Sequence, residues 1–404
     1  MYLRLEQLQQ IIDHRASSIA GSSHDYSAFQ GRLRYQRIVD VTPPPPHCDL
    51  LIDVNDLSSI IRSRYIREMG DAVTITSGRF EFRNFGFFGP CALPADLEEG
   101  LFLVGEQFLF SMEYTRWYLD ACRHNGSYRD FAWSPDGQHT SLTLSDEQFH
   151  EFNDPCLILA NPGQSIYGHW ILDMAPRLLL IKKGGFGLGI AVVLNHAPNW
   201  APIFFKAFDF TPASVTSFAP GLTRVRSALM PSATKAGHRL ATPLMPDAWR
   251  QLKRFFEEEN RQSREHDALP RPAKIFVSRR LWHDDRRVIQ NISDVEKAAA
   301  ARGYTIIHPE KYSVAQQAAM FSRARAIIGE DGSGLHNVIF AEPGCVLGVI
   351  GVPERTNLWH LGICELLGHR SAYIQACFDA NGQRMVRAVD ASDLLSAIDA
   401  HTTL

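Results

Sequence analysis

Short apolar runs rich in valine and isoleucine recur along the chain from residue 156 onward, separated by segments long enough for helices. Before residue 240 these runs are CLILA, IAVVLN, VTSF and RVRSALM. After residue 272 the alternation is clearest, with the runs KIFVS, YTIIHP, ARAIIGE, CVLGVIG and SAYIQACF. Strands that alternate with helices in this way predict an α/β fold with parallel, doubly wound sheets.

Breaks in this pattern mark the predicted ends of domains. Residues 1–46 form an N-terminal appendage that closes with a run of four prolines. Residues 47–245 form an N-terminal α/β domain, within which residues 73–89 alternate like a β-hairpin. The charged stretch 247–265 predicts a long exposed helix, and the sequence LPRP at 269–272 then breaks the chain.

The rest of the chain is predicted to be a second domain and a final helix. Residues 246–385 form a C-terminal Rossmann-like domain, and residues 386–404 form a C-terminal helix that we expect to pack back on the first domain. Two such domains facing each other leave a cleft between the carboxyl ends of their strands. Open α/β sheets bind their ligands in such clefts.

Charge and cysteine content narrow the class of protein. The 41 Lys and Arg residues nearly balance 44 Asp and Glu residues, so no long-range attraction for nucleic acid arises. The seven cysteines are scattered and lack CxxC spacing, which argues against a disulfide framework and against a structural zinc site. This cysteine pattern favours a protein of the reducing cytoplasm. No run of 18 apolar residues predicts a transmembrane segment. The basic segment 61–67 predicts a solvated helix face and leaves peripheral membrane contact open, and the oligomeric state is not indicated.

A glycine-rich turn is the first candidate for phosphate binding. The sequence AIIGEDGSGLHN at 326–337 predicts a strand, a tight turn and a helix start. Gly332 and Gly334 lack a Cβ atom, so the backbone N–H groups around Ser333 can approach a pyrophosphate at a helix N-terminus. The alternative is a purely structural turn. Asn337 stands where a dinucleotide motif GxGxxG needs its third glycine, which weakens a dinucleotide interpretation.

An arginine cluster is the second candidate. SRR at 278–280 follows the strand KIFVS, and Arg286, Arg287 and Asn291 come shortly after. An arginine at the carboxyl end of a strand points into the ligand crevice, where its planar guanidinium can bond to phosphate oxygens. The alternative is a solvated loop in which Asp284 and Asp285 balance the charge.

A histidine and an aspartate four residues apart are the candidates for acid–base chemistry. On a helix, His169 and Asp173 lie on one face within reach of each other, and either could deprotonate a hydroxyl group. Pro176 disfavours a helix through this point, so residues 169–173 are expected to form a separate turn before a helix that begins at Pro176. A structural histidine beside Trp170 is the alternative.

Taken in order, these segments resemble glycosyltransferase family 61. The resemblance rests on KIFVSRR, RRVIQN and the stretch from 302 to 344, which contains a glutamine-bearing helix and the glycine loop. Upstream, Gly168-His169-Trp170 through Asp173, Pro176 and Arg177 resembles the HW…D…PR segment of that family. The resemblance covers residues 155–350, and the ordered combination is more specific than any single motif.

The resemblance implies a GT-B architecture, with two Rossmann-like domains across a cleft, and an inverting hexosyl- or pentosyltransferase, which the absence of a DxD motif predicts to be metal-independent. It implies a nucleotide-sugar donor, usually UDP-linked, a glycan or glycolipid acceptor such as a growing polysaccharide, and no cofactor. No DxD motif, the metal clamp of the other main glycosyltransferase architecture, occurs in the chain.

The resemblance also implies roles for individual residues. Asp173 or His169 is the catalytic base. Donor and phosphate binding falls to a further set, namely Arg279, Arg287, Asn291, Gly332, Ser333, Gly334 and Asn337. Asn357 and His360 lie beyond the range of the resemblance, and their position on the loop and helix after the strand CVLGVIG makes them, together with Asp331, candidates for contacts to the sugar or the base.

Two departures from the family pattern leave other functions open. Asp331 stands where the family usually has histidine, and Ile292 stands where glutamate often follows the asparagine. An acid beside a diphosphate repels it. A non-catalytic nucleotide-sugar-binding protein is therefore one alternative. A nucleotide-sugar epimerase on the same two-domain architecture is the other.

Overall fold

The computed structural model describes residues 2–3, 31–41, 48–69, 75–89, 92–98, 101–103, 108, 131–133, 140–142, 149–161, 163–219, 221–235, 244–262, 269–282, 289–352 and 357–402. The chain divides into two compact units. Unit 1 comprises Met1–Val41 and Thr74–Gly237, and unit 2 comprises Thr42–Val73 and His238–Leu404. Each unit is thus built from two separate stretches of sequence, whereas the sequence pattern predicts continuous domains.

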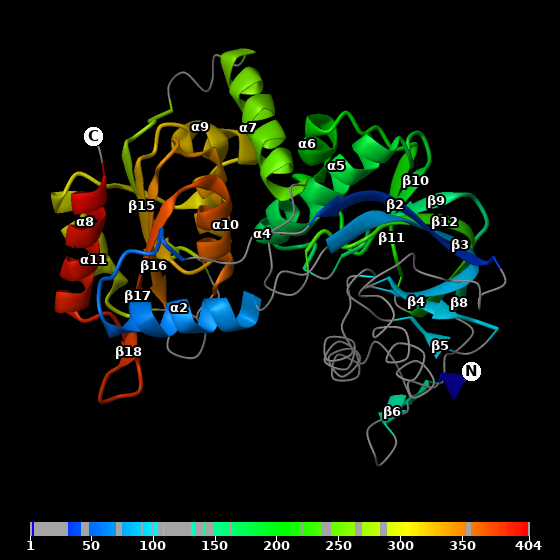
Figure 1. The fold of residues 1–404 in the computed structure, drawn as a ribbon, viewed down its shortest axis with the longest axis horizontal. Helices are drawn as coiled ribbons and strands as arrows, with labels where there is room; N and C mark the ends of the chain where they lie inside the picture. The colour runs from blue at the N-terminus through cyan, green and yellow to red at the C-terminus, as the bar shows by residue number, and fades with distance from the viewer. Residues whose placement is uncertain are drawn as a thin grey trace. The chain divides into compact units, whose positions relative to one another are not determined.

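Unit 1 is built on a mixed nine-stranded sheet (Figure 1). The strand order is β11-β10-β9-β12-β3-β4-β5, with β2 also paired to β3 and β8 to β12. The strands are β2 (Leu33–Val41), β3 (Ile75–Gly89), β4 (Leu93–Asp96), β5 (Leu101–Phe102), β8 (Phe149–Phe152), β9 (Cys156–Ile158), β10 (Ala191–Leu194), β11 (Ser214–Ser217) and β12 (Gly221–Pro231). The predicted parallel pairing is present among β9 to β12, β8 also pairs in parallel with β12, and antiparallel strands complete the sheet. A separate three-stranded sheet joins β1 (Tyr2–Leu3), β7 (Thr140–Leu142) and β6 (Phe131–Trp133).

The expected hairpin at residues 73–89 is wrong, because β3 is one long strand that pairs with β2 and β12 on its two sides. Phe82 and Phe85, which flank the middle of β3, are completely buried. Between them Asn84 has a φ of 54°. The pairing with β12 keeps the same register on both sides of Asn84, so the strand continues through the core instead of reversing.

Unit 2 contains a five-stranded parallel sheet of order β14-β13-β15-β16-β17. Its strands are β13 (Lys274–Val277), β14 (Thr305–Ile307), β15 (Ala326–Glu330), β16 (Val346–Gly351) and β17 (Arg370–Gln375). All residues of β15 and β16 are buried, as expected for central strands covered on both faces. The doubly wound sheet predicted for this half of the chain is therefore present.

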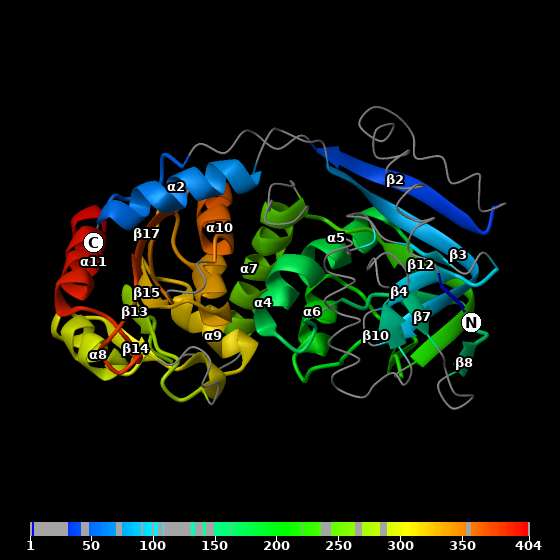
Figure 2. The ribbon, with the colours of Figure 1, turned by 90° about the horizontal axis from the view of Figure 1, so that it is seen from below.

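Helices cover both faces of this sheet (Figures 1 and 2). On one side lie α8 (Ile292–Ala301) and α11 (Ala388–His401), and on the other lie α7 (Leu244–Gln262), α9 (Val314–Phe321) and α10 (Trp359–Leu367). The C-terminal helix α11 packs on β16 and β17 of unit 2 through Leu394, Leu395 and Ile398, so the expectation that it packs on the first domain is wrong. A small hairpin, β18 (Cys377–Phe378) and β19 (Arg384–Met385), precedes α11.

Helix α7 is amphipathic instead of simply exposed. Leu244, Ala248, Leu252 and Phe256 recur at four-residue spacing and are buried. The charged residues that suggested an exposed helix occupy only its other face.

Residues 48–69 belong to unit 2 and pair with its edge strand β17. The backbone N–H of Ile52 donates to the carbonyl of Ser371 in β17 at 2.7 Å, and the N–H of Ser371 donates to the carbonyl of Leu50 at 3.0 Å. Helix α2 (Asp56–Met69) follows and contacts β17. This segment therefore satisfies an edge that would otherwise expose unpaired backbone groups.

Candidate functional site

The two predicted phosphate-binding segments lie at neighbouring strand ends in unit 2. Arg279 follows β13, and the glycine turn follows β15. These strands are adjacent, with Val277 opposite Gly329. The chain runs to β14 on one side of β13 and to β16 on the other side of β15, so the strand order reverses between them. Open α/β sheets bind ligands at such a reversal, outside the carboxyl ends of the strands.

Arg279 and the glycine turn touch each other directly. The guanidinium Nη1 of Arg279 donates to the carbonyl of Asp331 at 3.3 Å. A Cβ atom on Gly332 would lie 2.1 Å from the same Nη1. The φ of Gly332 is 167°, an extended conformation open to any residue, so a larger residue here would displace the Arg279 guanidinium and would not strain the backbone. The arginine and the glycine turn, which were separate candidates for phosphate binding in the sequence, are therefore in direct contact.

The turn leads into a tight helix. A Cβ atom on Gly334 would come within 3.0 Å of a methyl group of Val277 and 3.1 Å of Pro309. The predicted helix start is present as the 3₁₀-helix η8 (Ser333–Phe340), in which the N–H of Leu335 donates to the carbonyl of Gly332 at 3.1 Å. Gly334 thus lets the chain pass close to Val277 at the carboxyl end of β13.

Asp331 lies beneath this turn and faces α10. It is 3% exposed, and its Oδ1 lies 3.0 Å from Nε2 of His360, which is fully buried. The ring of His336 lies beside that of His360, with 4.9 Å between their centroids. The sequence suggested Asp331 and His360 as contacts to a sugar or base, and the structure pairs them with each other. The carboxylate that replaces the family's histidine therefore has a partner inside unit 2.

Glu330 lies at the same carboxyl edge of the sheet, and the sequence analysis missed it. Its Oε2 accepts a hydrogen bond from the backbone N–H of Arg279 at 2.7 Å, and the side chain is 5% exposed. Burial raises the pKa of Glu330 to about 7, although the N–H and the charge of Arg279 lower it. Its position as the last residue of a strand, at the carboxyl edge, was the available signal.

Other predicted donor-binding residues make bonds within unit 2. The fully buried Asn337 donates from Nδ2 to Oε1 of Gln317 at 2.8 Å. Asn291 bonds through both halves of its amide to the backbone of Val386. Asn357 accepts a hydrogen bond from the N–H of Trp359 at the start of α10. Arg287 lies outside the described residues.

In unit 1, the histidine and aspartate candidates lie on one helical run with a widened turn. The run consists of α4 (Tyr167–His169), the π-helix η4 (Trp170–Met174) and α5 (Ala175–Gly184). The N–H of Ala175 donates to the carbonyl of Trp170, five residues back. Pro176 has no N–H to donate, and the wider turn before it keeps the helical run continuous. The expected separate turn at 169–173 is therefore wrong.

The predicted pair is nevertheless formed. Nδ1 of His169 lies 2.6 Å from Oδ2 of Asp173. The other carboxylate oxygen lies 2.7 Å from Nζ of Lys235, which follows β12. Nδ2 of Asn161 donates to Oδ2 at 3.2 Å. Lys235 and Asn161 come from distant parts of the sequence, and no local motif marks them.

These partners decide the charge of Asp173, which is 5% exposed. Burial alone would raise its pKa, but Lys235 and His169 outweigh burial and hold the pKa well below its ordinary value. Asp173 is therefore a carboxylate at neutral pH. A carboxylate facing Nδ1 favours the imidazole tautomer with its proton on Nδ1, which places the lone pair on Nε2.

Arg177, the last residue of the HW…D…PR segment, is completely buried. Its guanidinium donates to the carbonyls of Ala160 at 3.1 Å and Pro231 at 3.2 Å. Burial lowers its pKa to about 9, while Asp173 acts in the opposite direction. Arg177 therefore ties together the segments that follow β9 and end β12, next to the histidine and aspartate.

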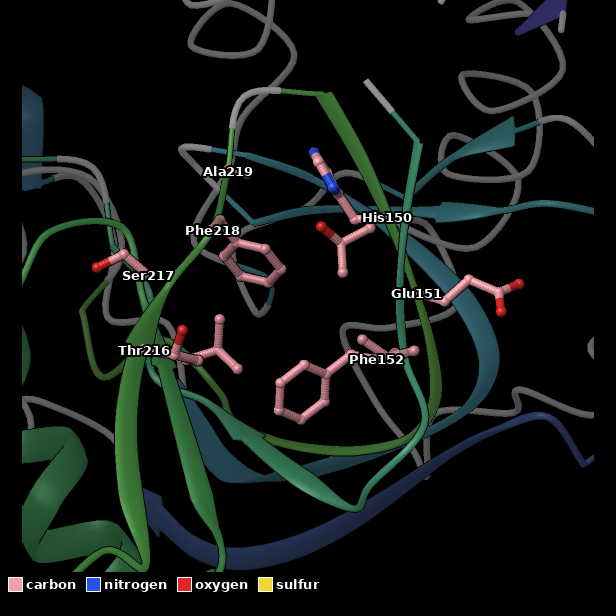
Figure 3. Close-up of a pocket in the computed structure, with 10 residues that line it drawn as sticks. His150, Glu151, Phe152, Thr216, Ser217, Phe218 and Ala219 are labelled. Carbon is pink, nitrogen blue, oxygen red and sulfur yellow. The ribbon is translucent and has the colours of Figure 1, made fainter. Parts of the chain in front are cut away.

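A cavity of about 120 Å³ lies elsewhere in unit 1, among β8, β10, β11 and β12 (Figure 3). Phe152 and Phe218 face it, and Glu151 points away from it. None of the candidate residues described above lines this cavity.

The described residues contain neither a metal-ligand cluster nor a membrane-spanning helix. Among them, no group of three or more His, Cys, Asp or Glu side chains is arranged to hold a metal ion. None of the helices in the described part of the chain has the length and apolar character needed to cross a membrane. Metal independence stays a prediction.

Comparison with known proteins gives one family. Residues 167–348 match the family described as Glycosyltransferase 61. The matched range begins at the first residue of α4 and ends inside β16, so it includes parts of both units and both groups of candidate residues. No curated protein matches the chain. The resemblance inferred from the motifs is confirmed, and residues 167–348 are a glycosyltransferase family 61 domain.

Proposed function

We propose that this protein is an inverting glycosyltransferase that moves a sugar from a nucleotide-sugar donor, UDP-linked, to a hydroxyl group of a glycan or glycolipid. Unit 2 takes the donor and unit 1 the acceptor, in a GT-B arrangement. The contact between Arg279 and the glycine turn at the strand-order reversal of unit 2 carries this proposal. The family match over both units supports it.

Arg279 and the backbone of the glycine turn stabilise the leaving diphosphate. The guanidinium supplies a fixed positive charge and several N–H donors beside Gly332. Groups that are already in place for the developing negative charge lower the barrier to transfer because they need no reorganisation. Neither group requires a metal ion for this role.

His169 accepts the proton of the acceptor hydroxyl. Asp173 is a weak base because Lys235 and His169 hold its pKa well below its ordinary value. Its oxygens already face three partners, whereas the His169 side chain is 22% exposed. Asp173 thus fixes the tautomer, and Nε2 of His169 is the basic atom.

The transfer replaces one bond at C1 of the donor sugar with another. The acceptor oxygen bonds to C1 of the donor sugar, and its proton passes to Nε2 of His169. The bond from C1 to the diphosphate oxygen breaks, and its electron pair leaves with the nucleoside diphosphate. Attack on the face opposite the leaving group inverts the configuration at C1.

A transfer assay with a panel of UDP, GDP, CMP and ADP sugars tests this function. We expect one donor class to release its nucleotide in the presence of a glycan acceptor. His169→Gln should reduce that rate by about 10²–10⁴ while donor affinity is unchanged, because it removes only the base. The proposal is refuted if no donor raises the melting temperature of the protein, or if His169→Gln transfers at the wild-type rate.

A further inference from the structure

A lysine from outside the helical run completes the pair of His169 and Asp173. Nζ of Lys235 lies 2.7 Å from Oδ1 of Asp173, on the carboxylate oxygen that His169 does not contact. The Lys235 side chain is 18% exposed and that of Asp173 is 6% exposed, so water screens this ion pair weakly. One carboxylate is therefore shared by two groups of different basicity.

Charge balance among these groups decides whether His169 is neutral. Among the described residues, Arg177 is a further charged group coupled to Asp173, and it sits among backbone carbonyls. With Lys235 present, the negative charge of Asp173 is compensated by a permanent cation. Without it, a mostly buried carboxylate would face His169 as its nearest cationic partner and would favour protonation of the imidazole. A protonated His169 cannot accept a proton.

We propose that Lys235 is a positioning residue for the proton transfer: its ammonium group compensates Asp173 and thereby keeps His169 neutral, with Nε2 ready to accept the acceptor's proton at neutral pH. The link to catalysis rests on the function proposed above. The effect of Lys235 on the protonation of His169 stands on the geometry of unit 1 alone. The two parts can therefore be tested separately.

The test measures the protonation of His169 by histidine NMR across pH, with the spectrum of His169→Gln identifying its signals. Lys235→Met should raise the pH at which His169 takes up its proton, because it removes the cation that lies 2.7 Å from Oδ1 of Asp173. Lys235→Gln, which keeps a hydrogen-bond donor but loses the charge, should shift it in the same direction. Lys235→Arg keeps the charge and should restore the wild-type value.

Lys182→Met is the matched control in the same unit. Lys182 pairs with Asp209 at 2.8 Å, but both side chains are largely solvent-exposed, so the same loss of charge should leave His169 unchanged. Circular dichroism identifies which variants are folded. An unshifted His169 in either folded neutral variant, Met or Gln, would overturn the proposal, as would an equal shift in Lys182→Met.

Activity then separates this proposal from the proposed function. If His169 is the base, the acidic limb of the pH profile of kcat/KM should move to higher pH in Lys235→Met by the NMR shift. The plateau above it should be kept. A moved His169 titration with an unmoved pH profile would support the role of Lys235 in unit 1 and refute His169 as the base.

Discussion

Replacing Glu330 with glutamine removes a buried charge from the carboxyl edge of the sheet in unit 2 and leaves the shape of the side chain nearly unchanged. The glutamine oxygen can still accept the hydrogen bond that Oε2 accepts from the N–H of Arg279. Burial raises the pKa of Glu330 from an ordinary value of 4.5 to about 7, so the folded state binds this proton more tightly than the unfolded state. The free energy of unfolding therefore falls as pH rises from about 4.5, and the loss is complete above about 7.

The size of this loss of stability follows from the shift in the pKa of Glu330. At about 1.4 kcal/mol per pH unit, the charged form of Glu330 destabilises the folded state by about 3 kcal/mol above neutral pH. Glu330→Gln should thus match the wild type at pH 4.5 and unfold at a higher temperature at pH 8. The gain is about 2–4 °C per kcal/mol for a domain of this size.

Scanning calorimetry at several pH values measures the difference, and Glu258→Gln is the matched control. Glu258 lies in α7 of the same unit with its side chain 53% exposed, so its replacement should change the melting temperature little at either pH. A melting temperature of Glu330→Gln that equals or lies below that of the wild type at pH 8 would refute the reasoning. Destabilisation by the same amount at both pH values would show that Glu330 acts through packing.

Three further predictions concern ligand binding and transfer. Affinity for a nucleoside diphosphate should weaken between pH 6 and pH 8 in the wild type, because Glu330 loses its proton beside Arg279. Calorimetry should show that the affinity of Glu330→Gln depends less on pH. Gly332→Ala should keep the fold but weaken nucleotide binding, because its Cβ would lie 2.1 Å from Nη1 of Arg279; unchanged affinity would show that the guanidinium position is unimportant. Chelation of divalent metal ions should leave transfer unchanged, and a loss of transfer restored by Mn²⁺ or Mg²⁺ would contradict the proposed metal-free diphosphate site.

The sequence predicted the strands of unit 2 and two parts of the candidate site, Arg279 and the glycine turn, because buried strands and strand ends leave local sequence signals. Val and Ile runs mark the buried strands of unit 2, and Ser313 with Gln316 forms a capping box at the start of α9. Arg279 and Gly332 both follow a parallel strand, so both were expected at one edge of the sheet. That they touch depends on the order of the strands, which local pattern does not contain.

The features that were missed depend on contacts between distant segments or on small backbone changes. Lys235 reaches Asp173 from the end of β12, and His360 reaches Asp331 from α10. In the sequence, Asp331 conflicts with a diphosphate site because an acid repels a diphosphate. Only the structure shows that this carboxylate is paired with His360. The π-helix at 170–174 differs from an α-helix by one hydrogen-bond step, and Pro176 was its only sequence signal.

The central claim is that Arg279 and the glycine turn bind the diphosphate of a nucleotide-sugar, and calorimetric titration of UDP tests it most directly. The matched pair is Arg279→Ala and Arg280→Ala, which remove the same charge from adjacent positions. Arg280 pairs with Glu296 at 3.2 Å, and its side chain is 52% exposed. The account predicts that Arg279→Ala weakens UDP binding by at least about tenfold, the value of one lost charge-assisted hydrogen bond, while Arg280→Ala has a much smaller effect. Equal losses in the two variants, or wild-type affinity in Arg279→Ala, would contradict it.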